Sequence, residues 1–395
     1  MAQFDSPDQL SLPDLEEDVL DWWQDHDIFE RSIEEREGRP TFTFYEGPPT
    51  ANGKPGIHHV LARAIKDIFC RYKTMQGYQV ARKAGWDTHG LPVEIEVEDE
   101  LGLESRADVE EYGVEKYNAA CRESVLEYKD LWDTLTQRMG YWVDLDDPYV
   151  TFETDYIESV WWLLKQIEEE DLLYKGHKIQ WYSPGSHTVL SSHEVSLGYE
   201  ETQDPSVYIR FPVAGEENTY FLAWTTTPWT LISNTALAVG PDLTYVQIHH
   251  EDPHQGPETL ILAEALLDEV IDEDYTVEKT FSGEELIGRE YEPVFDYFLD
   301  RAESGEEAWY VLGADVVSTE EGTGVVHMAP AFGEEDYAVA QEEGLPLFNP
   351  IDKDGEFTAE APLVEGMWFK DADKTITDDL KRRGRLYKHE TYLHN

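Results

Sequence analysis

The sequence has 395 residues, of which 41% are hydrophobic and 12% aromatic, so it is neither a small disulfide-stapled peptide nor a disordered acidic tail. Its 84 acidic and 30 basic residues give a net charge of −54. Such a chain repels itself unless salt screens the charges, and the Debye length falls to about 3 Å at 1 M salt. We therefore predict that it works in a salt-rich cytosol.

Targeting and redox features also favour the cytoplasm. The N-terminus is acidic rather than basic, and no apolar run reaches the roughly 18 residues needed to span a bilayer. Two cysteines, Cys70 and Cys121, cannot build a disulfide framework, which indicates a reducing compartment. We expect a cytoplasmic protein without a membrane partner.

The N-terminal region is typical of a parallel α/β unit. Residues 11–36 have the spacing of one amphipathic helix, with Ser11 as its N-cap. A strand at residues 41–45, a helix at 58–75 and a second strand at 78–81 follow. Two strands that flank a crossover helix indicate a parallel sheet, whose ligands bind at the carboxyl ends of the strands.

Helices continue to about residue 174 and then give way to strands. Residues 105–140 and 153–174 are predicted to be helical, and the run from Trp161 to Leu164 is too densely apolar for an exposed face. After about residue 200, short β-like runs are separated by Gly, Pro and acidic loops, which predicts a separate β-rich domain. Helices are expected there only near residues 262–271, 334–343 and 372–384.

One stretch departs from the acidic background. Residues 51–90 contain seven basic residues and two acidic ones, a net charge of +5. Binding of phosphate normally requires a basic surface, which the rest of the chain does not offer. We expect an anionic ligand to bind in this stretch.

Residues 44–59, FYEGPPTANGKPGIHH, combine a glycine- and proline-rich turn with two histidines. Such a turn lets the backbone approach a ligand, a helix N-terminus offers free N–H groups to phosphate, and histidines can hydrogen-bond a developing anion. On composition alone, a simple strand-to-helix turn with surface histidines is the better interpretation. A second motif, GWDTHGLPVE at residues 85–94, reverses that judgement.

Together the motifs resemble those of the class I aminoacyl-tRNA synthetases and, within them, the isoleucyl-tRNA synthetases. The GPP-x-A-NG turn, the histidine motif, the helix residues 66–72 and GWDTHGLPVE match in order, whereas valyl and leucyl relatives differ in the last of these. The resemblance covers the whole chain and implies an α/β fold. It implies a catalytic domain with a partial Rossmann-type parallel sheet, and an inserted editing domain that is β-rich, barrel-like and α+β.

The resemblance assigns roles at the first site. Gly47, Pro48 and Asp87 should line the amino-acid pocket, with Asp87 paired to the α-ammonium group of isoleucine. The histidine motif should bind ATP, used with Mg²⁺, and stabilise charge as the isoleucine carboxylate attacks the α-phosphate; His58 and His59 are the residues expected to act in catalysis. The full set expected at this site is Gly47, Pro48, Pro49, Asn52, Gly53, Gly56, His58, His59 and Asp87.

The histidine motif departs from the family pattern. The usual order is His, apolar, Gly, His, but here it reads Gly56-Ile57-His58-His59, so the first His and the Gly are exchanged. The family's Gly leaves room for adenine, so His58 should reshape that contact and its imidazole could replace the missing first His. We hypothesise that the exchange also alters the binding of inhibitors that copy the isoleucyl adenylate.

Residues 224–235 (WTTTPWTLISNT) and 322–337 (GTGVVHMAPAFGEEDY) form a second pair of motifs. Clustered threonine hydroxyls can hold a ribose or a water, although threonines at the end of a strand are most often simple β-formers. The pair resembles two segments of the editing domain of isoleucyl, valyl and leucyl synthetases, which implies that Asp336 binds the α-ammonium group of a misattached amino acid. The residues expected around the ester and the terminal adenosine are Thr225, Thr226, Thr227, Thr230, Asn234 and His327.

The resemblance also implies the substrates. One methylene in an apolar pocket is worth only about 1–3 kcal/mol, a limit for which isoleucyl-tRNA synthetase is itself the standard example. Valine must therefore pass the first site, and the second site would hydrolyse valyl-tRNA(Ile) while excluding isoleucine by size. The expected partners are isoleucine, ATP and tRNA(Ile), and we expect a monomer.

A metal site is not expected in this part of the chain. Ser183 and Ser186 stand where some relatives bind zinc through a cysteine pair, and thiolate is the ligand that favours zinc there. His177, His187 and His193 could form a nitrogen and oxygen site, although solvated or core histidines are the commoner case.

The expected organisation has four parts. We expect an N-terminal helix in residues 1–40, the first half of the aminoacylation domain with a connecting segment at 41–199, the editing domain at 200–388, and the return to the catalytic domain beginning at 389–395. No KMSKS-type loop occurs in the sequence, so this chain should not activate isoleucine by itself, but it could retain editing. A basic cluster at residues 381–388 could contact tRNA or merely complement a helix end. A free-standing tRNA-editing hydrolase and a non-catalytic RNA-binding protein are the alternatives.

Overall fold

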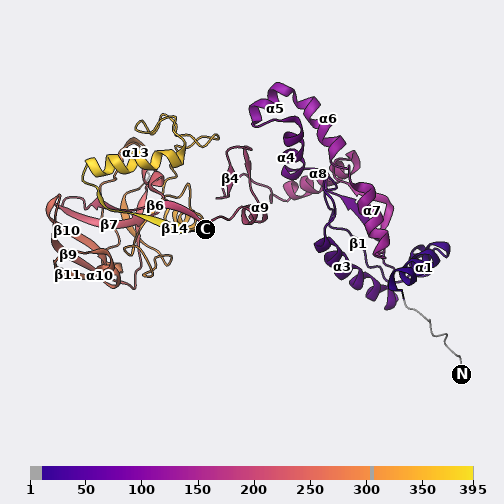
Figure 1. Cartoon of the computed structure of the whole chain (residues 1–395). Coiled ribbons are helices and arrows are strands. Elements are labelled where there is room, and N and C mark those ends of the chain that lie inside the picture. The colour runs from indigo at the N-terminus through magenta and orange to yellow at the C-terminus, as the bar shows by residue number, and fades with distance from the viewer. Residues whose placement is uncertain (1–10, 303–306, 395) are drawn as a thin grey trace. The chain divides into compact units, whose positions relative to one another are not determined.

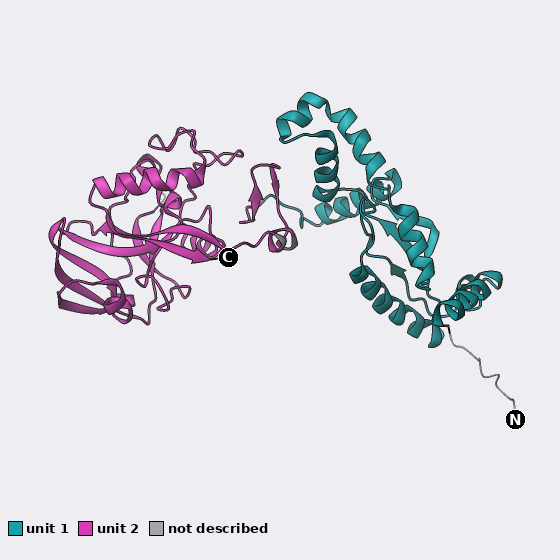
Figure 2. Cartoon of the chain, viewed as in Figure 1, with its two compact units in different colours: residues 1–175 teal, residues 176–395 magenta. Residues whose placement is uncertain are grey.

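The computed structural model describes residues 11–302 and 307–394, and the chain divides into two compact units, Met1–Lys175 and Gly176–Asn395 (Figure 2). Each unit combines helices with a β-sheet, so the fold is α/β, as predicted. None of the helices in the described residues is long and apolar enough to cross a membrane.

The N-terminal segment forms two helices rather than the single predicted one. α1 spans Leu12–Asp25 and α2 spans Ile28–Glu34. Asp27 adopts a left-handed conformation with φ of 48°, which breaks the helical path, because only a residue with αR geometry continues the hydrogen-bond ladder. Ser11 does occupy the N-cap position, although its side chain makes no capping hydrogen bond.

A three-stranded parallel sheet forms the centre of the first unit. Its strands are β1 (Phe44–Tyr45), β2 (Arg82–Trp86) and β3 (Asp144–Val150), in the order β1-β2-β3, and α3 (Ile57–Met75) crosses from β1 to β2. The predicted strand–helix–strand unit is therefore confirmed. Residues 78–81 hydrogen-bond to residues 40–44 but regular pairing begins only at Arg82, so the second strand was predicted four residues too early.

Helices complete the first unit, and several of them expose apolar faces. The predicted helical stretch 105–140 forms three helices, because Gly113 has φ of 103° and residues 125–128 leave the helical path. The prediction that Trp161 to Leu164 are buried is wrong: the Trp161 and Trp162 side chains are 71% and 61% exposed. The remaining helices of this unit are α4 (Leu91–Leu101), α5 (Arg106–Tyr112), α6 (Val114–Ser124), α7 (Lys129–Arg138) and α8 (Thr154–Glu169).

A nine-stranded mixed sheet dominates the second unit (Figure 1). Seven strands follow the order β11-β9-β10-β7-β13-β8-β12, while β6 pairs with both β7 and β14. The predicted short strands are all present. The nine strands are β6 (Thr202–Pro212), β7 (Thr219–Thr225), β8 (Ala236–Val239), β9 (Thr244–Asp252), β10 (Gly256–Ala263), β11 (Tyr275–Ser282), β12 (Tyr310–Gly313), β13 (Val325–Met328) and β14 (Leu386–His394).

Short helices and one long helix surround this sheet. A small hairpin of β4 (Tyr182–Ser183) and β5 (Thr188–Val189) precedes it. The predicted helices near residues 262–271, 334–343 and 372–384 are present, and the last of these contributes Ala372, Ile376 and Leu380 to the core. The prediction that these are the only helices after residue 200 is wrong, because short helices also form at Pro228–Ser233, Gly283–Glu285 and Leu299–Ala302. The helices of the unit are α9 (Ser192–Leu197), η1 (Pro228–Ser233), η2 (Glu264–Leu266), α10 (Leu267–Val270), η3 (Gly283–Glu285), α11 (Leu299–Ala302), α12 (Glu334–Glu343) and α13 (Phe369–Arg382).

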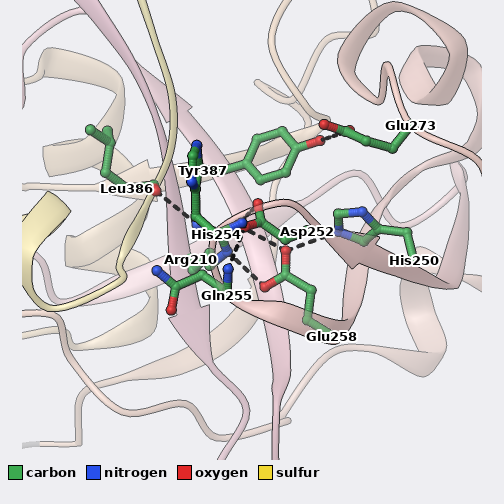
Figure 3. Close-up of polar contacts among 9 residues, drawn as sticks. All are labelled: Arg210, His250, Asp252, His254, Gln255, Glu258, Glu273, Leu386 and Tyr387. Atoms are coloured by element: carbon green, nitrogen blue, oxygen red, sulfur yellow. Dashed lines mark hydrogen bonds and ion pairs between the residues drawn. The ribbon is translucent and has the colours of Figure 1, made fainter.

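A buried ion cluster ties β14 to the rest of the sheet (Figure 3). The guanidinium group of Arg210 on β6 donates to both carboxylate oxygens of Glu258 at 2.8 Å, and to Asp252 at 2.8 Å. It also donates to the Leu386 carbonyl at 2.7 Å, and the Arg210 side chain is only 1% exposed. Burial opposes ionisation of Asp252, but backbone N–H groups and Arg210 outweigh it and lower its pKa. The cluster therefore holds four strands together by charge.

Candidate functional site

The two motifs of the first site meet at the carboxyl ends of β1 and β2. The Asp87 backbone N–H donates to the Pro49 carbonyl at 3.0 Å, and Thr50 and Asp87 form a parallel β-bridge. The proline turn and the GWD motif therefore run side by side, at the edge where parallel sheets bind ligands. The Asp87 carboxylate accepts a hydrogen bond from the His89 backbone N–H at 3.3 Å.

Glu46 organises this edge and was missed by the sequence reasoning. Its carboxylate is 3% exposed and contacts both the Lys66 ammonium group and the Tyr141 hydroxyl. The Tyr149 hydroxyl contacts the Glu46 backbone carbonyl, and a Cβ atom on Gly85 would collide with the Tyr149 ring. A single acidic residue between a strand and a proline turn gives no pattern in the sequence from which this role could be predicted.

The histidine motif begins helix α3. The Gly56 backbone N–H donates to Nδ1 of His59 at 2.9 Å, so the Nε2 atom of His59 carries the hydrogen. Burial lowers the pKa of His59, and the charges of His58 and Arg63 lower it further. His59 is thus a neutral hydrogen-bond donor. Its ring centroid lies 3.8 Å from that of His58 and 4.6 Å from that of Trp132.

The exchange of Gly and His in this motif forms a coupled pair. A Cβ atom built on Gly56 would lie 2.7 Å from Cε1 of His58, which is closer than real Cβ contacts. The His58 ring in its present orientation therefore occupies the space beside Gly56, and it would have to move if position 56 carried a side chain.

Asn52 and Gly53 hold the turn in place. The Asn52 side-chain amide donates to the Pro92 carbonyl at 3.0 Å, and the indole N–H of Trp132 donates to the Gly53 carbonyl at 2.8 Å. Asn52 is 8% exposed. These two residues therefore connect the turn to the second motif and to α7. Gly47 is exposed, and a Cβ atom there would lie 3.8 Å from the Lys66 ammonium nitrogen.

Ion pairs neutralise most of the positive charge at residues 51–90. Four of its seven basic side chains pair with carboxylates: Lys66 with Glu46, Arg71 and Arg82 with Asp67, and Lys83 with Asp147. The Arg63 guanidinium group is buried over the Trp132 ring at 4.9 Å. Lys54 is exposed beside the turn, 6.0 Å from the Tyr128 ring centroid. The positive charge left for the anionic ligand expected here is therefore smaller than the net charge of residues 51–90 indicated.

The second site is a chain of neutral hydrogen bonds. The hydroxyls of Thr225 and Thr227 are 3.1 Å apart, and those of Thr227 and Thr230 are 3.2 Å apart. The Thr230 hydroxyl lies 2.9 Å from Nε2 of His327, and the Asn234 amide nitrogen lies 3.0 Å from Nδ1 of His327. Five of the six residues that were expected around the ester therefore form one network, although they come from segments about a hundred positions apart.

The network determines the tautomer of His327. The Tyr291 hydroxyl donates to Oδ1 of Asn234 at 2.6 Å, so the Asn234 amide N–H₂ faces His327 and donates to Nδ1. Nε2 of His327 then carries the hydrogen and donates to Thr230. Burial lowers the pKa of His327 to about 4, so it stays neutral near pH 7. Tyr291 and Trp309, whose indole N–H donates to the Asn234 carbonyl at 3.0 Å, were missed by sequence analysis because neither belongs to a motif.

Asp336 lies in the first turn of α12. Its Oδ2 atom accepts a hydrogen bond from the Ala329 backbone N–H at 2.8 Å, directly after β13, which carries His327. Burial raises the pKa of Asp336, and Glu335 adds to the rise. A Cβ atom on Gly333 would lie 2.9 Å from Cγ of Asp336, so glycine makes room for the carboxylate. In the part of the chain that the structure describes, the Thr226 hydroxyl makes no hydrogen bond with another side chain.

Of the three possible metal ligands, His187 is placed in an ion pair. His187 pairs with Asp354 at 2.7 Å, and the side chain of His193 is outside the described residues. Within residues 11–302 and 307–394, no group of three or more His, Cys, Asp or Glu side chains could hold a metal ion.

Acidic neighbours pair with the basic cluster near the C-terminus. Arg382 and Arg383 both contact the Asp379 carboxylate. Lys388 lies 3.1 Å from Glu390. These pairs leave less positive charge for tRNA than the sequence suggested.

Comparison with known proteins identifies the family of this chain and several relatives. The profile of the family described as tRNA synthetases class I (I, L, M and V) matches residues 18–386. An isoleucine–tRNA ligase of Streptomyces coelicolor is 50% identical over 395 residues, covering 98% of this chain and 37% of the relative. Its counterpart in Thermus thermophilus is 49% identical over 390 residues, covering 98% of this chain and 36% of the relative. The chain thus spans little more than a third of the curated relatives it matches.

Solved structures give weaker likenesses. The cytosolic leucyl-tRNA synthetase editing domain of P. falciparum is 11% identical with a TM-score of 0.38, and covers 47% of this chain and 99% of its own. The corresponding P. knowlesi domain is 13% identical with a TM-score of 0.37, and covers 48% of this chain and 97% of its own.

Proposed function

Because the chain belongs to the class I tRNA synthetases of the isoleucine, leucine, methionine and valine group, we propose that it is part of an isoleucine–tRNA ligase that also edits valyl-tRNA(Ile). The single observation that carries this proposal is the meeting of the proline turn and the GWD motif at Pro49 and Asp87, in a chain about 50% identical to isoleucine–tRNA ligases. The ligase reaction is a proposal for the longer protein.

In the activation step, the isoleucine carboxylate attacks the α-phosphate of ATP and pyrophosphate leaves. Asp87 binds the ammonium group of isoleucine, and Gly47 and Pro48 line the side-chain pocket. The neutral His59 donates its Nε2 hydrogen to phosphate, since Nδ1 is already occupied by the Gly56 N–H. Mg²⁺ would supply charge neutralisation and is normally held largely by substrate phosphates, so it does not require a group of protein carboxylates, and none is found within residues 11–302 and 307–394. Pro49, Asn52, Gly53 and His58 complete the nucleotide side of the site.

In the editing step, water attacks the ester carbonyl of valyl-tRNA and the ribose oxygen leaves with a proton. Asp336 binds the ammonium group of valine. His327 is a hydrogen-bond donor with a pKa of about 4, which favours a role in orienting Thr230 over a role as general base. The hydroxyls of Thr225, Thr226 and Thr227 hold the water and the terminal adenosine.

The test measures hydrolysis of valyl-tRNA(Ile) and isoleucyl-tRNA(Ile) by the 395-residue chain in molar KCl. We expect selective loss of valine, and an Asp336→Ala variant that is folded but no longer discriminates between the two esters. Equal rates for the native chain and the variant would exclude Asp336 as the amino-acid ligand. A folded chain that hydrolyses neither ester would contradict the proposal that this fragment edits by itself.

The exchanged histidine motif supports a proposal on inhibitor binding. Because the His58 ring fills the space beside Gly56, the change must be made at both positions. We expect the Gly56→His, His58→Gly double variant of the full-length enzyme to differ from the native enzyme in its inhibition by analogues of the isoleucyl adenylate. Equal inhibition of the two enzymes refutes this hypothesis. The Gly56→His single variant is the control and should disturb the site by collision.

The charge of −54 supports a proposed origin in a salt-rich, halophilic cytoplasm. Screening by salt should remove much of the self-repulsion. We expect the unfolding temperature to rise markedly between dilute buffer and molar KCl, and a temperature that does not respond to KCl contradicts the proposal.

The proposed organisation follows from the same assignment. Residues 41–199 belong to the first half of the aminoacylation domain, after an N-terminal helical segment at 1–40. The nine-stranded sheet supports assigning an editing domain that begins near residue 200. The proposed boundary at residue 388 falls within β14, so residues 389–394 still pair with β6 where we propose that the return to the catalytic domain begins. We expect a cytoplasmic monomer, which sedimentation in molar KCl would check.

A further inference from the structure

The helix that carries Thr230 begins without a cap of its own. η1 starts at Pro228, which has no N–H, so the Trp229 N–H is one of the first free donors of this helix. Thr227 occupies the N-cap position, but its hydroxyl makes no capping bond and instead lies between those of Thr225 and Thr230. Another group must therefore accept the Trp229 N–H.

Asp373 on α13 is that group. Its Oδ1 atom accepts a hydrogen bond from the Trp229 backbone N–H at 2.8 Å, and Asp373 is only 7% exposed. The cap thus comes from a residue 144 positions away along the chain, which leaves the Thr227 hydroxyl available to the network.

The Trp229 ring links the same turn to two other segments. Its centroid lies 4.7 Å from that of Phe369 on α13, and 4.7 Å from that of Phe332 in the loop before Asp336. Movement of the Trp229 peptide would therefore disturb both the threonine hydroxyls and the loop that leads to the expected ammonium ligand.

Charged groups from two elements, α13 and β6, act on the Asp373 carboxylate. Lys370 lies on the same helix, and Asp204 on β6 pairs with Lys370 at 2.8 Å and with His394 on β14 at 2.9 Å. Burial raises the pKa of Asp373 to about 7, and Asp204 adds to the rise, whereas the Trp229 N–H and Lys370 oppose it.

We propose that Asp373 is a positioning residue for the hydrolytic site: its carboxylate holds the Trp229 peptide, and thereby the turn on which Thr227 and Thr230 present their hydroxyls. This inference rests on the proposed editing function. Asp373 acts through the backbone and does not touch the substrate.

The experiment compares Asp373→Ala, which removes the acceptor, with Asp373→Asn, which keeps an oxygen in the same place. Asp371→Ala is the matched control, because Asp371 is exposed on the same helix. Two quantities are measured in molar KCl on the 395-residue chain: kcat and KM for hydrolysis of valyl-tRNA(Ile), and amide hydrogen exchange of residues 225–233.

We expect Asp373→Ala to lower kcat by about 10-fold to 100-fold with little change in KM, since small misplacements of reacting groups cost that much. Amide exchange of residues 225–233 should become faster in this variant. Asp373→Asn should have a kcat and an amide exchange rate close to those of the native chain. Asp371→Ala should change neither quantity. The ratio of native to Asn rates should rise with pH through about 7, where the native carboxyl ionises.

Unchanged exchange at residues 225–233 in Asp373→Ala would overturn the inference, whether or not the chain hydrolyses valyl-tRNA. A native chain that hydrolyses nothing, with faster exchange in the Ala variant, would remove the editing proposal while keeping Asp373 as the cap of the turn. If circular dichroism shows that Asp373→Ala is unfolded, the Asp373→Asn variant decides. Amide exchange in Asp373→Asn that is still faster than in the native chain would reduce Asp373 to a structural role and overturn the inference.

Discussion

The two units bury their apolar residues to very different extents. In the second unit, one continuous core runs from Val207 on β6 to Leu380 on α13. In the first unit, the buried residues form three small clusters. Helix α3 exposes an apolar stripe there, whose members recur every three or four positions: Ile57, Leu61, Ile65, Ile68, Tyr72 and Met75. Such spacing is typical of a helix face that packs against another element, so the first unit presents an exposed apolar helix face, whereas the second buries most of its apolar residues in one large core.

The two units also differ in how their polar groups are paired. In the first unit, opposite charges pair directly: Glu46 pairs with Lys66, and Asp67 pairs with Arg82. Around His327, neutral hydroxyl, amide and imidazole groups are paired by hydrogen bonds in a buried pocket. The second unit also contains the buried ion cluster at Arg210, so both units pair charges and the second adds a buried network of neutral groups.

The largest effect is expected at Arg210 in the second unit. Arg210→Met replaces the guanidinium group with an apolar side chain of similar length and leaves Glu258 and Asp252 buried without their arginine partner. Removing one partner of a buried ion pair costs about 3–5 kcal/mol, and we expect the upper part of that range for the free energy of unfolding by urea. Adding Glu258→Leu and Asp252→Asn should recover much of the loss. A single variant as stable as the native chain would contradict the importance given to this cluster.

A matched pair of phenylalanines compares the two units directly. Phe221 on β7 is fully buried and Phe69 on α3 is 64% exposed. Phe221→Ala should lower the free energy of unfolding by about 3–4 kcal/mol, because it leaves a cavity in a packed core. Phe69→Ala should change it little, since the ring is already in water. Equal losses in urea unfolding would show that the Phe69 side chain is covered in solution.

The pH dependence of His327 should have an intermediate effect. Its folded pKa of about 4 lies below the ordinary value of 6.5, so as the pH falls from about 6.5 towards 4 the unfolded chain takes up the proton first and stability is lost. The loss approaches about 3 kcal/mol. His327→Gln should therefore lose less stability than the native chain between neutral pH and pH of about 4.5.

Asp373 should change the stability with pH in the direction opposite to His327. Its pKa is raised to about 7, so its contribution to stability grows as the pH falls through 7 and opposes that of His327. Only the difference between the native chain and His327→Gln, measured by urea unfolding at each pH, isolates the histidine. A constant difference across this range would contradict the buried neutral state of His327.

The smallest effect is expected for an ion pair on the surface of the first unit. Arg31 and Glu35 are 52% and 59% exposed and lie 2.8 Å apart. Arg31→Ala should change the free energy of unfolding by less than about 1 kcal/mol, because water and salt screen exposed pairs. A loss comparable to that at Arg210 would remove the distinction drawn here between buried and exposed charges.

Local patterns were enough to predict much of the fold. The strand–turn–helix unit at residues 41–75, the strands β6, β7, β9 and β12 of the second unit and the helix at residues 334–343 were predicted and are present. The N-terminal helix was predicted as a single element because its apolar spacing continues past Asp27, whose left-handed backbone has no signal in that spacing. The burial of Trp161 was predicted wrongly because apolar density shows what could be buried, but not whether a partner element is present.

The sequence by itself determined which residues could carry chemistry, because glycine turns, clustered threonines and adjacent histidines are chemical features of the chain and need no neighbours to be recognised. Only the tertiary structure decided how those groups are used. Asp67 neutralises Arg82, Asp373 caps a turn 144 positions away, and Asn234 sets the tautomer of His327. Charge pairing, burial and hydrogen-bond direction depend on contacts between distant segments, so no local pattern contains them.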